Sequence, residues 1–230
     1  MHDVKGEITL FMPEPATIRI VECSPPSWMV QLALEEKELD YEIRRLSFSA
    51  GEHKSAEMLA RNPRGNVPVL SHGHINIYET FAILEYLEYA FPNPPLLPES
   101  NQLRALALTR LHESTGLKAA GMALFRYLMT TRAVSLEHSA IEDLAIPLHD
   151  ELFFWEHYYS MSRWAAGSAL SLADLAVFTY LAAAVHLGLR FGDRYPKLRS
   201  FYESMRARPS VDLTWPAPWE EHAYTFLGET

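Results

Sequence analysis

Hydrophobic and polar positions change their period along the chain, which predicts two parts of different character. Up to about residue 91, short β-branched or alternating runs take turns with amphipathic helical runs. After residue 100 only helical periodicity is clear. The proline-rich run between them allows neither a helix nor a central strand to continue. We therefore expect an α/β domain over residues 1–91, a linker over residues 92–100 and an all-helical domain over residues 101–230.

The first part is expected to form a small mixed sheet flanked by helices. Gly73 separates its last two strands, which indicates a hairpin and hence one antiparallel pair. The strand-like run Ile8–Phe11 has no place in this order. We therefore interpret residues 1–16 as an N-terminal extension, either an added edge strand or a loosely ordered arm. The predicted strands are 17–21, 41–46, 67–70 and 75–77, and the predicted helices follow Pro26 and cover 55–61 and 79–90.

The second part is expected to be a bundle of four or more helices. Ser171 precedes an apolar run and is followed three residues later by Asp174, which is the arrangement of a capping box. We assign both residues to folding. The predicted helices are 103–129, 141–159, one that begins after Ser171, and 196–206.

Composition narrows the possible partners. The chain of 230 residues carries a formal charge of −9, which disfavours binding to nucleic acid or to an anionic membrane surface. The longest apolar run, Leu175–Val185, is too short to span a bilayer, and the N-terminus has no apolar core of a secretory signal. The single cysteine excludes an intrachain disulfide, and the ten histidines show no ligand spacing, so we expect no metal. A reducing, cytoplasmic location fits best.

Three segments in this order resemble the soluble glutathione transferase family. They are Ser24–Lys37, Gly51–Leu70, which is most similar to the phi class, and Tyr78–Leu87. The resemblance implies a thioredoxin-like N-terminal domain followed by a helical domain. It also implies a homodimeric detoxification enzyme that adds the thiol of glutathione, its co-substrate, to a small apolar electrophile.

Ser24 is the candidate catalytic residue. A free thiol has a pKa of about 8.5, so a site must donate hydrogen bonds to the thiolate to lower that pKa. Ser24 stands where a strand is expected to end and a helix to begin, where the helix dipole and unpaired N–H groups favour negative charge. By resemblance, Ser24 stabilises the thiolate as in the serine-type classes. The alternative is that Ser24 only caps the helix, a role that we assign to Ser27.

Three other functions remain open at this point. A glutathione-dependent oxidoreductase would use Cys23, although adjacent strand residues face opposite ways and a buried, inert cysteine is the commoner outcome. A non-catalytic glutathione-binding or regulatory protein would share the fold. A zeta-like isomerase is also conceivable, although Pro26 stands where that class has a cysteine.

The resemblance also implies residues that bind glutathione. Val67, before an expected cis peptide bond to Pro68, would pair with the cysteinyl backbone like an added strand. Thr80 and the helix start would hold the γ-glutamyl carboxylate, and Glu79 its ammonium group.

Three further positions match phi-class residues at the other end of glutathione. His53 and Lys54 would meet the glycyl carboxylate, and Asn66 occupies a position that is glutamine in that class. Without the resemblance, His53 and Lys54 would be read as solvated loop.

The pocket for the electrophile is expected to be aromatic. Its candidates are Trp28, Phe125, Tyr127 and Trp164. Aromatic residues at helical spacing belong more often to a core than to a pocket, which is the alternative here.

Overall fold

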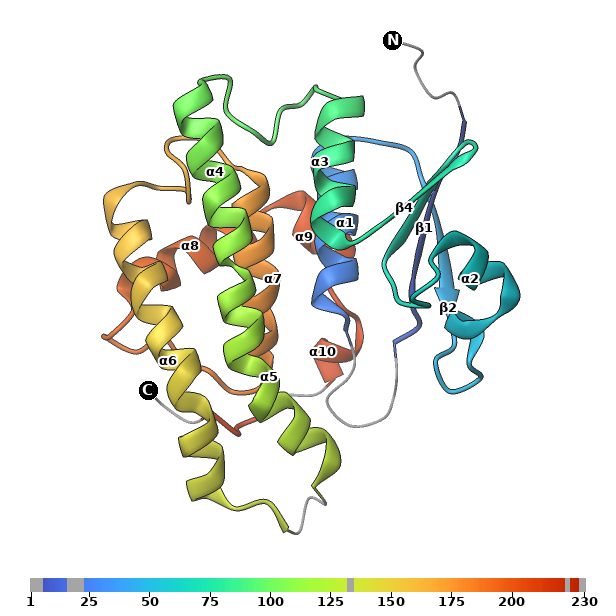
Figure 1. Cartoon of the computed structure of the whole chain (residues 1–230). Helices are drawn as coiled ribbons and strands as arrows, with labels where there is room; N and C mark the ends of the chain where they lie inside the picture. The colour runs from blue at the N-terminus through green and yellow to red at the C-terminus, as the bar shows by residue number, and fades with distance from the viewer. Residues whose placement is uncertain (1–5, 16–22, 132–134, 222–223, 228–230) are drawn as a thin grey trace. The chain divides into compact units, whose positions relative to one another are not determined.

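The computed structural model describes residues 6–15, 23–131, 135–221 and 224–227 (Figure 1). The described residues up to Leu96 form one compact unit, and those from Leu97 onward form a second. The strand predicted at residues 17–21 lies outside the described residues.

The first unit is built on a four-stranded mixed sheet. Its strands are β1 (Ile8–Pro13), β2 (Glu42–Leu46), β3 (Val69–His72) and β4 (Ile75–Tyr78), in the spatial order β2-β1-β3-β4. The strand β1 runs parallel to β2 and antiparallel to β3, and the hairpin of β3 and β4 is antiparallel as predicted.

The strand β1 corrects the prediction for the N-terminus. Ile8–Pro13 is an inner strand, with Leu10 opposite Ile43 on one side and Leu70 on the other. It is therefore neither an added edge strand nor a loose arm, and it is part of the basic fold. A strand that is buried on both faces needs no polar alternation, so its apolar run gave a weaker strand signal than the β-branched run at residues 17–21.

Helices cover both faces of this sheet. The helices α1 (Pro25–Glu36) and α3 (Thr80–Ala90) pack together on one face, as Figure 1 shows. The other face is covered by α2 (Ala56–Arg61), which follows the short 3-10 helix η1 (Glu52–Lys54). There Met58 of α2 packs on the buried strand residues Phe11 and Val69.

Lys37 ties the end of α1 to the end of α3. Its side chain is 0% exposed, and its Nζ lies 2.6 Å from a carboxylate oxygen of Glu88. The same Nζ donates hydrogen bonds to the carbonyl oxygens of Phe91 at 2.7 Å and Pro94 at 3.0 Å. The first half of the proline-rich run is therefore held by the first unit.

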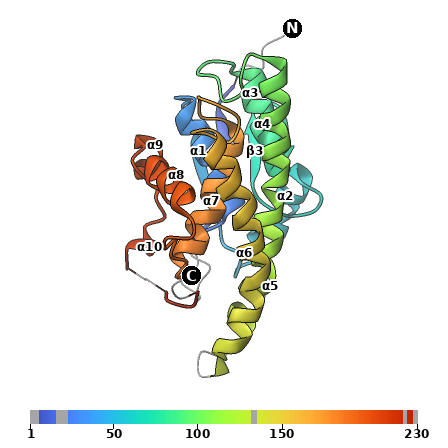
Figure 2. The same ribbon diagram turned by 90° about the vertical axis from the view of Figure 1, so that its left-hand side faces the viewer.

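Among its described residues, the regular elements of the second unit are all helices, with one isolated β-bridge between Trp164 and Gly167 in a loop. The single helix predicted over residues 103–129 is two helices, because the chain breaks at Ser114, whose hydroxyl donates to the carbonyl of Leu111 at 2.6 Å. Figures 1 and 2 show α5 and α6 side by side along much of their length. The helices are α4 (Asn101–Glu113), α5 (Thr115–Thr130), α6 (His138–Met161), α7 (Leu172–His186), α8 (Pro196–Arg206), α9 (Pro209–Thr214) and α10 (Pro218–Glu221).

The predicted capping box at the start of α7 is confirmed. The buried carboxylate of Asp174 accepts hydrogen bonds from the backbone N–H and the hydroxyl of Ser171, at 2.8 and 2.7 Å. It also accepts from the N–H of Ala165 at 2.8 Å and from the hydroxyl of Tyr159 at 3.1 Å. Burial raises the pKa of Asp174 to about 6, against the opposing effect of these four donors. Asp174 therefore joins the end of α6, the following loop and the start of α7.

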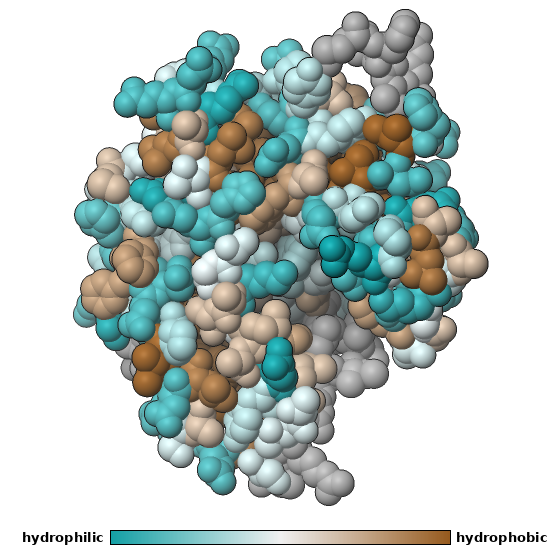
Figure 3. Space-filling model, in the orientation of Figure 1, coloured by the Kyte–Doolittle hydropathy of each residue, from teal (hydrophilic) through white to brown (hydrophobic). Residues whose placement is uncertain are grey.

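The surface is consistent with a protein whose large apolar side chains lie mostly inside. On the face drawn in Figure 3, hydrophobic residues form separate patches among hydrophilic ones. No helix within the described ranges is long and apolar enough to cross a membrane.

Candidate functional site

Ser24 occupies the N-cap position of α1, and its hydroxyl makes no capping hydrogen bond. The carbonyl oxygen of Ser24 accepts from the N–H groups of Ser27 and Trp28, at 3.0 and 2.9 Å. The first two helical residues are Pro25 and Pro26, which have no N–H to donate. An ordinary helix start has unpaired backbone N–H groups, but here two are absent and the next two already donate to Ser24. The hydrogen-bond donors that remain at this end of α1 are therefore side-chain hydroxyls.

Ser27 differs from its predicted role. We expected it to cap the helix, but it lies in the first turn of α1, and its side chain is buried. Its hydroxyl oxygen is 3.1 Å from the hydroxyl oxygen of Ser24, and either group can be the donor. The N-cap is Ser24, three residues before the predicted cap, because the Pro25-Pro26 pair is favoured at the first helical positions.

Cys23 lies directly before Ser24 and is half-buried. Burial raises the pKa of its thiol far above the usual range, and the positive charge of Arg45 offsets only part of this effect. A thiol that stays protonated at neutral pH is a poor nucleophile. The environment of Cys23 therefore favours an inert residue.

The segment before β3 is shaped by Asn62, a residue that the sequence analysis did not single out. Asn62 is buried, its side-chain amide donates to the carbonyl of Asn66 at 2.8 Å, and its side-chain oxygen accepts from the N–H of Arg64 at 3.0 Å. The peptide bond between Val67 and Pro68 is cis, which confirms that prediction. Asn66 is exposed and Val67 half-buried. The Asn-Pro pair at positions 62 and 63 was the available signal for this turn.

The loop that carries His53 and Lys54 lies against this segment. Lys54 Nζ donates to the carbonyl of Arg64 at 2.8 Å. Gly65 has a positive φ of 60°, and a Cβ there would come within 2.7 Å of the Lys54 side chain. The ring of His53 stacks on Phe48 at 4.1 Å between ring centroids, and its Nδ1 has no hydrogen-bond partner among the described residues. His53 and Lys54, two of the predicted glycyl-carboxylate residues, therefore lie in η1, next to the turn before β3.

Glu79 and Thr80 begin α3 as predicted. Glu79 is exposed at the N-cap position and has the unusual backbone angles φ 68° and ψ 118°. Positive φ in a residue other than glycine is uncommon and costs about 1–3 kcal/mol when the surrounding structure enforces it. Such strain is typical of positions where the backbone or side chain serves a ligand.

The four aromatic candidates for the electrophile pocket lie in different surroundings. Trp28, in the first unit, is 1% exposed, and Trp164, in the second, is 5% exposed. Phe125 and Tyr127 are half-buried on α5, and the hydroxyl of Tyr127 accepts a hydrogen bond from the N–H of Glu137 at 3.1 Å. Phe125 and Tyr127 thus offer more surface to a ligand than the two tryptophans do.

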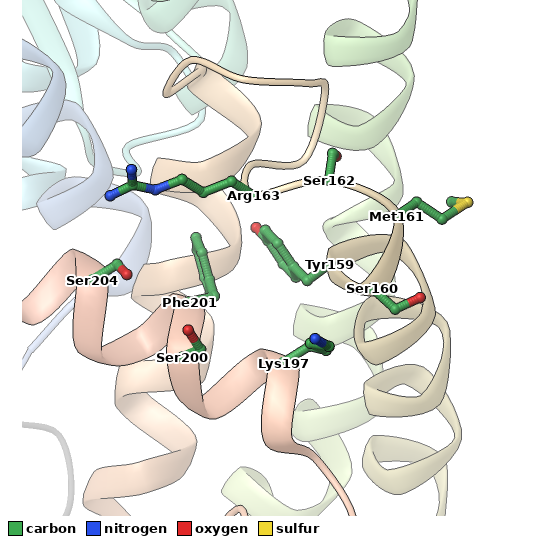
Figure 4. Close-up of a pocket in the computed structure, with 9 residues that line it drawn as sticks. All are labelled: Tyr159, Ser160, Met161, Ser162, Arg163, Lys197, Ser200, Phe201 and Ser204. Atoms are coloured by element: carbon green, nitrogen blue, oxygen red, sulfur yellow. The ribbon is translucent and has the colours of Figure 1, made fainter.

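A separate hollow of about 510 Å³ lies in the second unit, between the end of α6 and α8 (Figure 4). Two cationic side chains, Arg163 and Lys197, line it together with several serines. The N-terminal N–H groups of α8 are already bound by the carboxylate of Glu156, at 3.0 Å to Lys197 and 2.9 Å to Leu198. None of the predicted site residues lines this hollow. In the part of the chain that the structure describes, no group of three or more histidine, cysteine or acidic side chains is arranged to hold a metal ion.

A mixed four-stranded sheet flanked by helices, with a serine as the N-cap of α1, is followed by a helical unit, and this arrangement defines the class of two-part proteins with a thioredoxin-like first domain. Family models agree with this class. The model for the N-terminal domain of glutathione S-transferase matches residues 21–89, and the model for the C-terminal domain matches residues 145–212.

Individual relatives extend the match over most of the chain. Glutathione S-transferase A of Pleuronectes platessa is 36% identical over 203 residues, which cover 86% of this chain and 90% of that protein. The crystal structure of a glutathione S-transferase from the Antarctic clam Laternula elliptica is 31% identical, with a TM-score of 0.83 over 96% of this chain and 98% of that one. A structure of glutathione S-transferase-I bound with lactoylglutathione is 26% identical, with a TM-score of 0.75 over 91% and 98% of the two chains. The chain belongs to the glutathione S-transferase family, and it is an enzyme of that family.

Proposed function

We propose that the enzyme activates the thiol of glutathione through the hydroxyl of Ser24 and adds it to a small apolar electrophile. The observation that carries this proposal is the state of the Ser24 side chain. Its hydroxyl sits at the start of α1, is not used for capping, and is half-buried rather than enclosed. Because Pro25 and Pro26 remove two N–H donors, this hydroxyl is the group best placed to stabilise an anion there.

Activation of the glutathione thiol depends on the hydroxyl proton of Ser24. Its O–H donates a charge-assisted hydrogen bond to the thiolate, which favours the ionised form and lowers the pKa of the thiol. The thiol proton passes to solvent, and the thiolate attacks an electrophilic carbon. For a halide substrate, the new S–C bond forms as the C–halogen bond breaks and the halide departs. Addition to an activated double bond and peroxide reduction begin from the same thiolate.

Six residues of the first unit are proposed to hold glutathione. Its γ-glutamyl carboxylate would lie at the N-terminus of α3, where helix N–H groups and the Thr80 hydroxyl favour an anion. The glycyl carboxylate would meet the positive charge of Lys54. The backbone of Val67 would pair with the cysteinyl unit. The remaining members of the set are Glu79 for the ammonium group, and His53 and Asn66 beside the glycyl end.

Three broader properties belong to the same proposal. The enzyme is serine-type, with a glutathione loop most similar to the phi class, as the segment Gly51–Leu70 suggests. It acts as a homodimer, a view supported by apolar side chains that stay exposed, such as Tyr89 of α3 at 70%. It works in the cytoplasm, where a reducing environment keeps both glutathione and Cys23 as thiols.

The test compares Ser24→Ala with Cys23→Ala in two assays, conjugation of glutathione to a chloronitrobenzene and reduction of a mixed disulfide. A hydrogen bond to a charged group contributes about 1.5–3 kcal/mol, so we expect Ser24→Ala to lower kcat/KM for conjugation about 10- to 100-fold. Cys23→Ala should retain conjugation activity within about twofold. Full activity of Ser24→Ala in both assays would overturn the proposal. Loss of disulfide reduction in Cys23→Ala alone would favour an oxidoreductase.

A further inference from the structure

The hydroxyl of Ser27 has a position that folding alone does not explain. Ser27 is 0% exposed, and a buried hydroxyl needs a hydrogen-bond partner. Its backbone N–H already donates to the carbonyl of Ser24, so the side chain is not needed to complete the first turn of α1. The side-chain oxygen lies instead 3.1 Å from that of Ser24.

Only one direction of this hydrogen bond is compatible with the proposed role of Ser24. A hydroxyl has one proton and two acceptor lone pairs. If Ser24 donates to Ser27, it has no proton left for the sulfur. If Ser27 donates to Ser24, the proton of Ser24 is released toward the thiolate, and the bond that Ser24 accepts polarises the bond that it donates.

We propose that Ser27 is a positioning residue that donates its hydrogen bond to Ser24 and thereby directs the Ser24 proton at the glutathione sulfur. This inference rests on the proposed function, because it assumes that Ser24 binds the thiolate. Ser27 does not touch the substrate and acts only through Ser24. The first turn of α1 thus contains a two-hydroxyl relay in place of the backbone N–H donors that Pro25 and Pro26 have removed.

The experiment measures the pKa of the enzyme-bound glutathione thiol, from the ultraviolet absorbance of the thiolate as a function of pH. The proteins are the wild type, Ser24→Ala, Ser27→Ala, the double variant, and Ser27→Thr as the conservative replacement. A control is Ser114→Ala, which removes another fully buried serine hydroxyl, at the break between α4 and α5. Cooperativity strengthens a hydrogen bond by about 10–30%, so Ser27→Ala should lower the thiolate-to-thiol ratio about two- to threefold at a pH near the midpoint. Ser27→Thr should restore most of it, and Ser114→Ala should leave it unchanged.

The double variant separates this inference from the proposed function. If Ser27 acts through Ser24, then Ser27→Ala has no further effect in the Ser24→Ala background. Suppose that Ser24→Ala raises the pKa of the bound thiol. If Ser27→Ala then leaves that pKa unchanged, or shifts it equally in the wild type and in Ser24→Ala, the relay is wrong and the proposed function stands. If Ser24→Ala itself leaves the pKa unchanged, the proposed function falls and the relay with it. If the extra methyl of Ser27→Thr prevents folding, the cycle with Ser27→Ala still decides, because that change only makes a side chain smaller.

Discussion

Replacement of Lys37 by methionine is expected to destabilise the first unit strongly. The Lys37 side chain is fully buried, with an ion pair to Glu88 and hydrogen bonds to two carbonyl oxygens. Methionine has a similar volume and removes the charge, so the packing changes little while the carboxylate of Glu88, itself about 10% exposed, loses its counter-charge. Removing one partner of a buried ion pair costs about 3–5 kcal/mol.

Urea unfolding followed by tryptophan fluorescence measures this cost, since Trp28 is buried in the same unit. With a slope of about 2 kcal/mol per molar urea, the midpoint of that transition should fall by about 2 M. The matched control is Lys118→Met on the exposed surface of α5, which should change the free energy of unfolding by less than about 0.5 kcal/mol.

A second variant tests the cause of the Lys37 effect. Glu88 also accepts a hydrogen bond from the N–H of Leu96 at 3.0 Å. The double change Lys37→Met with Glu88→Gln keeps an acceptor for that group and removes the unpaired charge, so it should recover about half of the loss or more. A loss below about 1 kcal/mol for Lys37→Met alone would refute the reasoning, because the charge of Glu88 would then be solvated without Lys37.

Three further predictions concern single residues. Burial raises the pKa of Asp174 from 3.8 to about 6, so the folded protein keeps this proton over a range in which the unfolded chain has released it. The contribution of Asp174 to stability should therefore fall by about 2 kcal/mol as the pH rises from about 4 to 6. Unfolding of the wild type and of Asp174→Asn is compared at these two pH values, and a constant difference between the two proteins would show that the pKa is normal. Glu79→Gly should remove the strain of the positive φ and so raise the melting temperature, while it increases KM for glutathione. A lower melting temperature would show that the backbone at this position is not strained. Because its pKa is raised, Cys23 should react with iodoacetamide at neutral pH at least about tenfold more slowly in the native than in the urea-unfolded protein, and equal rates would contradict its buried environment.

Helices and strands with a clear hydrophobic period or a local turn or capping signal were predictable from the sequence. The hairpin around Gly73, the helix from Thr80 to Ala90 and the capping box of Ser171 and Asp174 all depend on local signals, and the structure has them. The inner strand Ile8–Pro13 was misplaced because burial on both faces removes the alternation that marks a strand. The break at Ser114 was missed because a serine that bonds back to its own helix carries no strong stop signal.

Motifs supply candidate residues for the site, and the roles of Ser24, Val67 and Glu79 stay predictions. The hydroxyl contact between Ser24 and Ser27 was not predictable, because it depends on side-chain orientation, which spacing does not determine. The same holds for Asn62, whose amide organises the turn that ends at Asn66. Long-range partners were also hidden, since nothing in the helix pattern around Lys37 indicates that its charge is paired with Glu88, far along the chain.

The position of the glutathione sulfur tests the central claim most directly. In a crystal structure of the protein with bound glutathione, we predict the sulfur within about 3.5 Å of the Ser24 hydroxyl oxygen, beyond the N-terminus of α1. A sulfur bonded to or in contact with the thiol of Cys23, with the Ser24 hydroxyl directed elsewhere, would contradict the account.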